Sequence, residues 1–357
     1  MENSLVVSQS AGAVNDVGKK FSESIIPYIE EWFNSDELIR LSEQSKKSYC
    51  KSLIGRNSTK QDNNPLKKKS TCKTAFALWL DSQGINTPDK QAVKDWTKAM
   101  DAEKLSAATK NLRLTVVRNF FKWLNTEYGL PNIADLKGWK GAKDKEHQRG
   151  FLSCEQMREL MAAVDTAPLG GKKNHSPERE QLERKRDKAI IGTLLAAGLR
   201  TVEISRLCIG DVKSNGGLCY LAVLGKGQDT KIDVKLSRKA EQLIQDWLAA
   251  REKIDVVSDD SPLFCSLGNN SFGERLSSNS VSTLCKKYLE HAGLKTPQIV
   301  AHSLRHSLAT NSLLKGATLG EVQQQLRHSN LSTTQIYLHE VNKARNRCTD
   351  LIADEIF

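Results

Sequence analysis

Residues 302–306 read His-Ser-Leu-Arg-His, and Leu326-Arg327-His328 and Tyr337-Leu338-His339 follow at short intervals. A second polar segment, Ala197-Gly198-Leu199-Arg200-Thr201-Val202-Glu203-Ile204, lies far upstream inside an apolar stretch. An arginine in such surroundings is costly to bury unless it is paired or meets an anion. The two segments therefore direct attention to a site that holds an anionic group.

The residue types in these segments suit chemistry on a phosphodiester. Two arginines can hold both non-bridging oxygens of one phosphate and neutralise the charge that grows in the transition state. A tyrosine is a sound nucleophile for phosphorus once its proton can be passed on, and a nearby histidine can accept that proton. A lysine can protonate the departing 5′ oxygen. Such a set needs no metal ion, and the sequence shows no cluster of carboxylates.

In this order and spacing, A-G-L-R-T-x-E, H-x-L-R-H, L-R-H and Y-x-H resemble the tyrosine recombinase (integrase) family. The resemblance is strong over residues 186–340 and weaker over 21–136. The catalytic set that it implies is Arg200, Lys226, His302, Arg305, His328 and Tyr337 as the nucleophile, with Glu203 in a supporting role. One position departs from the family: Arg327 stands where a glycine commonly precedes the second histidine. We expect His306 and His339 to be packing or solvated residues.

The resemblance implies an enzyme that cleaves and rejoins DNA through a 3′-phosphotyrosyl intermediate, without metal, ATP or another cofactor. Its partners would be double-stranded DNA with paired core sites and, on synapsed DNA, a homotetramer, with accessory proteins also possible. Integration or excision of a mobile element (transposition) is the expected role. Alternatives are resolution of chromosome dimers, inversion of a DNA segment, a type IB topoisomerase-like nicking and closing activity, and a DNA-binding regulator without catalysis.

The bulk composition fits this expectation without deciding it. Lysine and arginine outnumber aspartate and glutamate by 53 to 42, which gives a net charge of +11 and suits a polyanionic partner. The 8 cysteines lie singly, without zinc-ligand spacing, as in a protein that keeps its thiols reduced. The sequence contains no long apolar run or secretory signal. We therefore expect a cytoplasmic, nucleoid-associated protein.

The expected fold class is mainly α with a small β-sheet. A flexible tail (1–20) precedes a helical, SAM-like core-binding domain (21–136), and a linker rich in Gly and Lys (137–150) leads to a mixed α/β catalytic domain (151–340). Residues 341–357 are predicted to form a tail helix carrying Leu351, Ile352 and Ile356. This helix packs either on its own domain or, by analogy with the family, on a neighbouring protomer in trans.

Hydrophobic periodicity in the N-terminal domain predicts successive helices. Thr87-Pro88 suits a helix start, and Ser106 suits the cap of a helix with Leu112, Val116, Phe120 and Leu124 on one face. The basic residues of that helix and of the loop 57–70 either contact DNA or form solvated surfaces. The candidate DNA contacts are Lys67, Lys68, Lys69, Lys110, Arg113, Arg118 and Lys122.

In the second domain, Ser153 is predicted to cap a helix that runs to Val164, and residues 166–185 are expected to be a polar connection. An apolar helical region, 186–207, is interrupted at Gly198. Residues 218–224 and 231–236 are predicted to be the two strands of a hairpin that turns at Gly225-Lys226-Gly227, and helices are expected from Ser237 onward.

Overall fold

The structure is a computed structural model that describes residues 20–58, 73–135, 150–168, 176–225 and 228–345. The chain divides into two compact units, residues 1–146 and residues 147–357. Each unit has its own hydrophobic core and is described by itself below.

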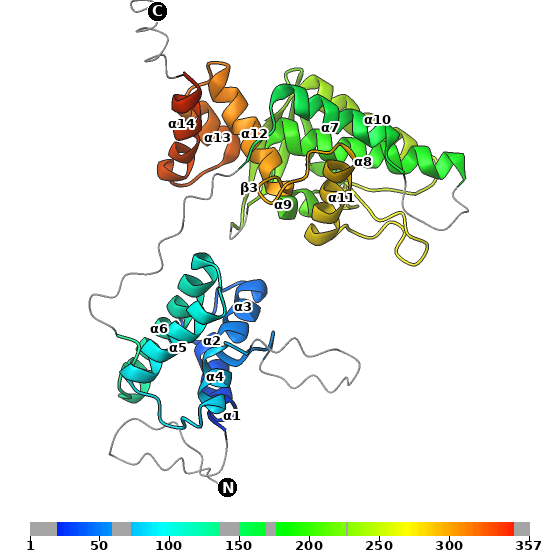
Figure 1. Cartoon of the computed structure of the whole chain (residues 1–357). Coiled ribbons are helices and arrows are strands. Elements are labelled where there is room, and N and C mark those ends of the chain that lie inside the picture. The colour runs from blue at the N-terminus through cyan, green and yellow to red at the C-terminus, as the bar shows by residue number, and fades with distance from the viewer. Residues whose placement is uncertain (1–19, 59–72, 136–149, 169–175, 226–227, 346–357) are drawn as a thin grey trace, which may run out of the picture. The chain divides into compact units, whose positions relative to one another are not determined.

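The N-terminal unit is helical throughout its described residues (Figure 1). Its helices are α1 (Phe21–Ser24), α2 (Ile26–Asn34), α3 (Glu43–Ile54), α4 (Phe76–Ser82), α5 (Lys90–Ala102) and α6 (Ala107–Tyr128). Aromatic side chains from α2, α4, α5 and α6 meet in one core. Trp32 packs against Phe120 with ring centroids 5.3 Å apart, and Phe76 lies edge-on to Trp96 at 5.0 Å. Such pairs add to the stabilisation from burial alone.

Helix caps follow the sequence in most places. Ser106 accepts the amide of Thr109 at the start of α6, which confirms the predicted cap. The start predicted at Thr87-Pro88 is displaced, because the Asp89 side chain caps α5 by accepting the amide of Ala92 at 2.7 Å. Aspartate is at least as good an N-cap as threonine, so the later residue sets the boundary.

The C-terminal unit, residues 147–357, is mainly helical. Its elements are α7 (Cys154–Thr166), α8 (Pro177–Ala197), α9 (Thr201–Arg206), η1 (Ile209–Asp211), β1 (Val212–Asn215), β2 (Leu218–Leu224), β3 (Lys231–Leu236), α10 (Arg238–Arg251), α11 (Ser278–His291), α12 (Ala301–Leu314), α13 (Leu319–Leu326) and α14 (Leu331–Arg345). Ser153 caps α7 with a capping box, as predicted. Residues 177–185, expected to be a connection, instead form the first turns of α8, capped by Ser176 with Pro177 in the first turn.

The described strands form one antiparallel sheet in the order β1-β2-β3. Strands β2 and β3 coincide with the predicted hairpin, whereas the short, mostly exposed β1 was not predicted. The expected fold class, mainly helical with a small sheet, is confirmed. Helices α12, α13 and α14 pack against one another at one end of this unit (Figure 1). Their core includes Tyr337, Leu326 and Val341.

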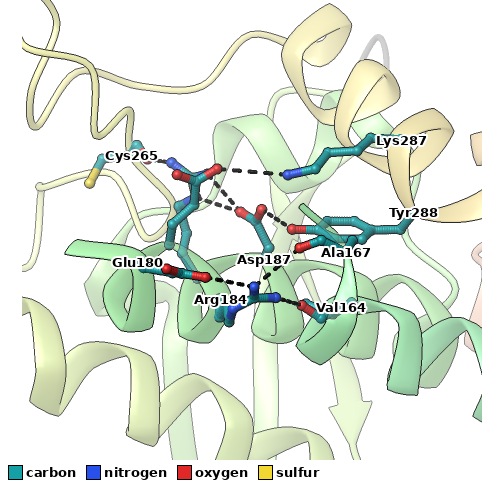
Figure 2. A network of polar contacts seen from close by, with 10 residues as sticks. Val164, Ala167, Glu180, Arg184, Asp187, Cys265, Lys287 and Tyr288 are labelled. Atoms are coloured by element: carbon teal, nitrogen blue, oxygen red, sulfur yellow. Dashed lines mark hydrogen bonds and ion pairs between the residues drawn. The ribbon is translucent and has the colours of Figure 1, made fainter. Parts of the chain in front are cut away.

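A polar cluster, which we call the Asp187 cluster, connects α8 to α11 (Figure 2). The Tyr288 hydroxyl donates to Asp187 at 2.6 Å, and the Arg186 guanidinium donates to the other oxygen of this carboxylate at 2.8 Å. Burial and the neighbouring Asp187 raise the pKa of Tyr288 far above its usual value, so its hydroxyl keeps its proton. Glu183 lies between Arg186 and Lys287, at 3.8 and 4.0 Å.

Within the described residues, the helices lack the length and apolar character to cross a bilayer. The same part of the chain contains no group of three or more histidine, cysteine, aspartate or glutamate side chains arranged to hold a metal ion.

Candidate active site

The site is organised around the sharp turn between α8 and α9. Gly198 ends α8 in the left-handed conformation, with φ of 64°, which glycine adopts without steric cost. A Cβ at this position would come within 2.7 Å of Leu326 and 2.9 Å of Leu308. Both the backbone conformation and the close approach of α12 and α13 therefore require glycine. The turn places Arg200 at the N-cap position of α9.

Arg200 and Glu203 hold one another by reciprocal contacts. The Arg200 guanidinium donates to Glu203 Oε1 at 2.8 Å, and the Arg200 backbone amide donates to Glu203 Oε2 at 2.8 Å. The Glu203 side chain is completely buried, whereas that of Arg200 stays 33% exposed. The arrangement fixes the guanidinium at its base and leaves part of it open to a ligand.

Arg305 is the most deeply buried arginine of the site, with 1% of its surface exposed. It extends from α12, and its guanidinium donates to the backbone oxygens of Gly198 and Leu326, which end α8 and α13. Burial and the nearby guanidinium of Arg200 lower the pKa of Arg305 to about 10, so it stays charged at neutral pH. Arg305 thus connects three elements of the site and carries a positive charge into its centre.

His328 follows the end of α13. Its Nδ1 lies 2.9 Å from the hydroxyl of Thr334, and its backbone oxygen accepts the Gln323 amide at 3.1 Å. Burial first, and then the charges of Arg305 and Arg200, lower the pKa of His328 to about 4. His328 is therefore neutral at physiological pH and is able to accept a proton.

Tyr337 lies on α14 between two histidines and is 4% exposed. Its ring is nearly parallel to that of His328, with centroids 6.2 Å apart, and is tilted against that of His306 at 5.2 Å. His306 in turn meets His302 edge-on at 4.7 Å. The structure thus brings Tyr337 into one cluster with the histidines of α12 and with His328.

A cavity of about 500 Å³ opens beside Arg200 and His302 at the N-terminus of α12. Its wall also carries Lys286 and Lys295, and the hydroxyl-bearing residues Thr201, Ser278 and Ser282. Cations and hydroxyl donors of this kind are the groups that contact phosphate oxygens.

The architecture and this constellation agree with comparisons against known proteins. Residues 150–344 match the family described as "Phage integrase family", and residues 74–128 match "Phage integrase, N-terminal SAM-like domain". The chain belongs to the phage integrase family. It is a tyrosine recombinase, an enzyme that cuts and rejoins DNA strands at specific sites.

Named relatives support this assignment. "Tyrosine recombinase XerC" of Pelotomaculum thermopropionicum is 33% identical over 253 residues, covering 70% of this chain and 76% of the relative. The XerC of Proteus mirabilis is 32% identical over 235 residues, covering 66% and 69%. The XerH site-specific recombinase in a post-cleavage complex with palindromic difH substrate shares the fold, with a TM-score of 0.66 at 20% identity, covering 94% of this chain and 97% of that one.

Some expected site residues of this recombinase lie outside the described residues, namely Lys226, Lys67, Lys68 and Lys69. In the sequence, Lys226 lies between the last residue of β2, Leu224, and the first residue of β3, Lys231.

The basic residues of α6 do not share one environment. Arg113 is 7% exposed and donates to the backbone oxygen and hydroxyl of Thr74, so it acts as a core contact rather than as the surface cation that was expected. Its neighbour Leu112 is exposed, although periodicity placed it on the apolar face. Lys110 forms an ion pair with Asp101 at 2.6 Å. Arg118 is half-buried and Lys122 is exposed on the same helix.

His306, which was interpreted as a packing or solvated residue, is buried with its ring packed between those of Tyr337 and His302. Sequence reasoning passed over two residues of the recombinase site. Thr334 gave no signal in the sequence. Arg327 was noted only as a departure from the family, and its side chain pairs with Glu203 at 2.7 Å. Only Arg327 could have been detected in advance, because a bulky residue at a position that favours glycine is unusual.

Proposed function

We propose that Tyr337 is the nucleophile of this recombinase and that Arg200 and Arg305 hold the scissile phosphate. The observation that carries the proposal is the convergence of distant segments on one place. The turn after α8, the helix α12, the residues after α13 and the helix α14 bring two arginines, two histidines and one tyrosine into a single cluster.

The cleavage step follows from these groups. The Tyr337 oxygen attacks phosphorus while its proton passes to neutral His328, and the bond from phosphorus to the 5′ oxygen breaks. The guanidinium groups of Arg200 and Arg305, assisted by His302, neutralise the charge on the pentacoordinate phosphate. Lys226 is proposed to protonate the departing 5′ oxygen. Attack by the 5′-hydroxyl of a partner strand reverses the step, so the phosphotyrosyl bond conserves the energy of the cleaved bond.

A suicide-substrate assay tests the nucleophile. Wild type and Tyr337→Phe are incubated with nicked duplexes from DNA flanking the gene, and Tyr220→Phe on β2 serves as a matched control. We expect a denaturation-resistant protein–DNA adduct with wild type and Tyr220→Phe, and none with Tyr337→Phe. An adduct with Tyr337→Phe refutes the nucleophile assignment. No adduct on any fragment that the wild-type protein binds favours a DNA-binding regulator.

For the biological role, we propose resolution of chromosome dimers ahead of integration of a mobile element. The named relatives at 30–33% identity are XerC recombinases. The Tn1549 transposon integrase and the lambda integrase share only 14% identity, which supports a common fold alone. Sequencing the DNA attached to the protein in host cells discriminates the two roles. A single near-palindromic chromosomal site supports dimer resolution, whereas the ends of an element support integration.

We also propose assembly into a homotetramer on paired sites, with the C-terminal tail docking on a neighbour. A groove of about 330 Å³ between β3, α12 and α13 is lined by apolar residues that include Leu236, Leu308 and Val322. Residues 346–357 lie outside the described residues and carry the apolar Leu351, Ile352 and Ile356. Truncation after residue 345 keeps Val341 in the core and is expected to weaken synapsis while preserving single-site binding. Unchanged synapsis refutes docking in trans.

In the N-terminal unit, we propose that Lys110, Arg118 and Lys122 contact DNA phosphates, together with Lys67, Lys68 and Lys69. Arg113 is left out because its guanidinium is engaged with Thr74. Replacing Lys122 with glutamine is expected to weaken binding to all DNA sequences. It should also reduce the slope of affinity against salt concentration by the equivalent of about one phosphate contact. Binding titrations between low and moderate salt measure this slope, and an unchanged slope removes Lys122 from the interface.

A further inference from the structure

Arg327 adopts a backbone conformation that most residues avoid. It ends α13 with φ of 55° and ψ of 46°, in the left-handed region where only glycine is free of steric cost. Lys104, with φ of 53°, is the other non-glycine residue in this region among the described parts of the chain. A strained conformation at a site of chemistry motivates a search for what the side chain does.

The Arg327 side chain is also buried at a cost. It is 4% exposed, and its guanidinium meets Glu203 Oε2 at 2.7 Å and the backbone oxygen of Gln325 at 3.1 Å. Its Nε is buried without a hydrogen-bond partner among the described residues. A buried donor that lacks a partner destabilises the fold. Arg327 therefore carries two local penalties at a position where glycine would carry neither.

Glu203 connects this residue to the proposed catalytic set. One of its oxygens accepts from the Arg200 guanidinium, and the other accepts from both the Arg200 amide and Arg327. Without Arg327, the Glu203 charge would be matched by Arg200 alone, and the carboxylate would lose the contact that fixes its second oxygen. The distance between Arg200 and the phosphate depends on where this carboxylate is held.

We propose that Arg327 is a positioning residue that fixes Glu203, and through it Arg200, and that its positive charge also acts on His328, the next residue in the chain. The inference rests on the proposed function, since it assigns a role to Arg327 in cleavage by Tyr337. Arg327 does not itself contact the reacting atoms. Its two contributions are separable, because one depends on the fork geometry of the guanidinium and the other on its charge.

The surroundings of His328 support the second contribution. The charged and titratable groups that face it are Arg305 and His302 on α12, Arg200 before α9, Arg327 beside it in the chain, and Tyr337 on α14. Burial and the positive groups lower the pKa of His328 to about 4. Loss of the Arg327 charge raises this pKa toward its ordinary value. The acid limb of the cleavage rate then moves to higher pH, because the reaction needs neutral His328.

The test measures single-turnover adduct formation, at subsaturating DNA and across pH, for wild type and three variants. Arg327→Gly suits the left-handed backbone and is expected to fold, but it lacks the charge and the contact with Glu203. Arg327→Met keeps the size and lacks the charge, and Arg327→Lys keeps the charge and lacks the fork. Arg251→Met is the control, since Arg251 is buried and paired with Asp255 away from the site.

We expect Arg327→Gly and Arg327→Met to cleave about 10- to 100-fold more slowly, the scale of a small misplacement in an active site, with DNA affinity changed less than about threefold. The acid limbs of their pH–rate profiles shift to higher pH. Arg327→Lys keeps the wild-type acid limb and recovers only part of the rate. Arg251→Met lowers the melting temperature and leaves the rate per folded molecule and the pH profile unchanged.

Two outcomes overturn the inference. If Arg327→Gly and Arg327→Met form adducts with the wild-type rate and pH profile, Arg327 has a structural role only. If Arg327→Lys shifts the acid limb as far as Arg327→Met, the charge does not act on His328. Either result leaves the proposed function intact, because wild type still forms the Tyr337 adduct. Absence of that adduct in wild type is a failure of the proposed function instead.

Discussion

The C-terminal unit contains two buried polar clusters that are similar in composition but differ in charge balance. In the Asp187 cluster, the two cations Arg186 and Lys287 face the two carboxylates of Asp187 and Glu183 (Figure 2). In the second cluster, which we call the arginine cluster, Arg200 and Arg327 both pair with one carboxylate, Glu203, and its negative charge also acts on Arg305.

The difference distinguishes a structural network from a binding site. Every charge of the Asp187 cluster has its counter-charge inside the protein, so the cluster is complete when the chain folds. The arginine cluster carries an excess of positive charge that the described residues do not offset. We propose that a phosphodiester balances this charge. Burial, and then the positive neighbours, lower the pKa values of Arg305 and His328.

The largest contrast is expected from removing one arginine of each cluster. Arg305→Met deletes a charge that we propose to stabilise the transition state, so cleavage should fall about 1,000-fold or more, the scale of transition-state arginines in phosphoryl transfer. Arg186→Met should leave cleavage per folded molecule unchanged while destabilising the fold. Adduct formation normalised to the folded fraction measures both. Equal losses of normalised activity in the two variants contradict the distinction between the clusters.

The next effect concerns stability. Asp187→Asn leaves Arg186 without its closest counter-charge and the Tyr288 hydroxyl without its carboxylate acceptor. Breaking a buried pair in this way costs about 3–5 kcal/mol. Chemical denaturation followed by circular dichroism should show this loss in the free energy of unfolding. A loss below about 1 kcal/mol means that the cluster contributes little to the fold.

The sequence predicted the features of the fold that depend on local information and missed others. The hairpin of β2 and β3 and the cap of α6 were predictable because the information is local, in alternating apolar residues and in Ser106. The burial of Arg113 was not predictable, because its partner Thr74 lies 39 residues away. The start of α8 at Pro177 was missed because its first turns are polar and have no apolar stripe of their own.

The sequence predicted two of the three arginines of the arginine cluster, and it did not predict their contacts. Arg200 and Arg305 were selected with His302, His328 and Tyr337 by residue type, order and resemblance to the family, and the structure brings these five residues together. Arg327 was noted only as a departure from the family. The sequence contains no sign that Arg305 connects the ends of α8 and α13 through backbone oxygens. Such contacts depend on where helices end in space, which only the packed structure determines.

A smaller effect is expected when an anion binds the arginine cluster. Sulfate should bind the arginine cluster and raise the thermal stability of this unit, by about 1.4 kcal/mol at ten times its dissociation constant. Calorimetry in sodium sulfate, against sodium chloride at equal ionic strength, separates binding from screening. The stabilisation should disappear in Arg305→Met and persist in Arg186→Met. Equal stabilisation of wild type and Arg305→Met by sulfate locates the anion elsewhere.

The last effect is the pH dependence of stability that burial and the positive neighbours of His328 impose through this residue. The folded state holds its pKa at about 4, below the ordinary value of 6.5. Between these values the unfolded chain binds more protons than the folded one, so stability falls as pH drops from 6.5 toward 4. His328→Asn should reduce this slope in the free energy of unfolding, and saturating sulfate should reduce it in wild type. An unchanged slope in sulfate means that no anion binds close enough to His328 to raise its pKa.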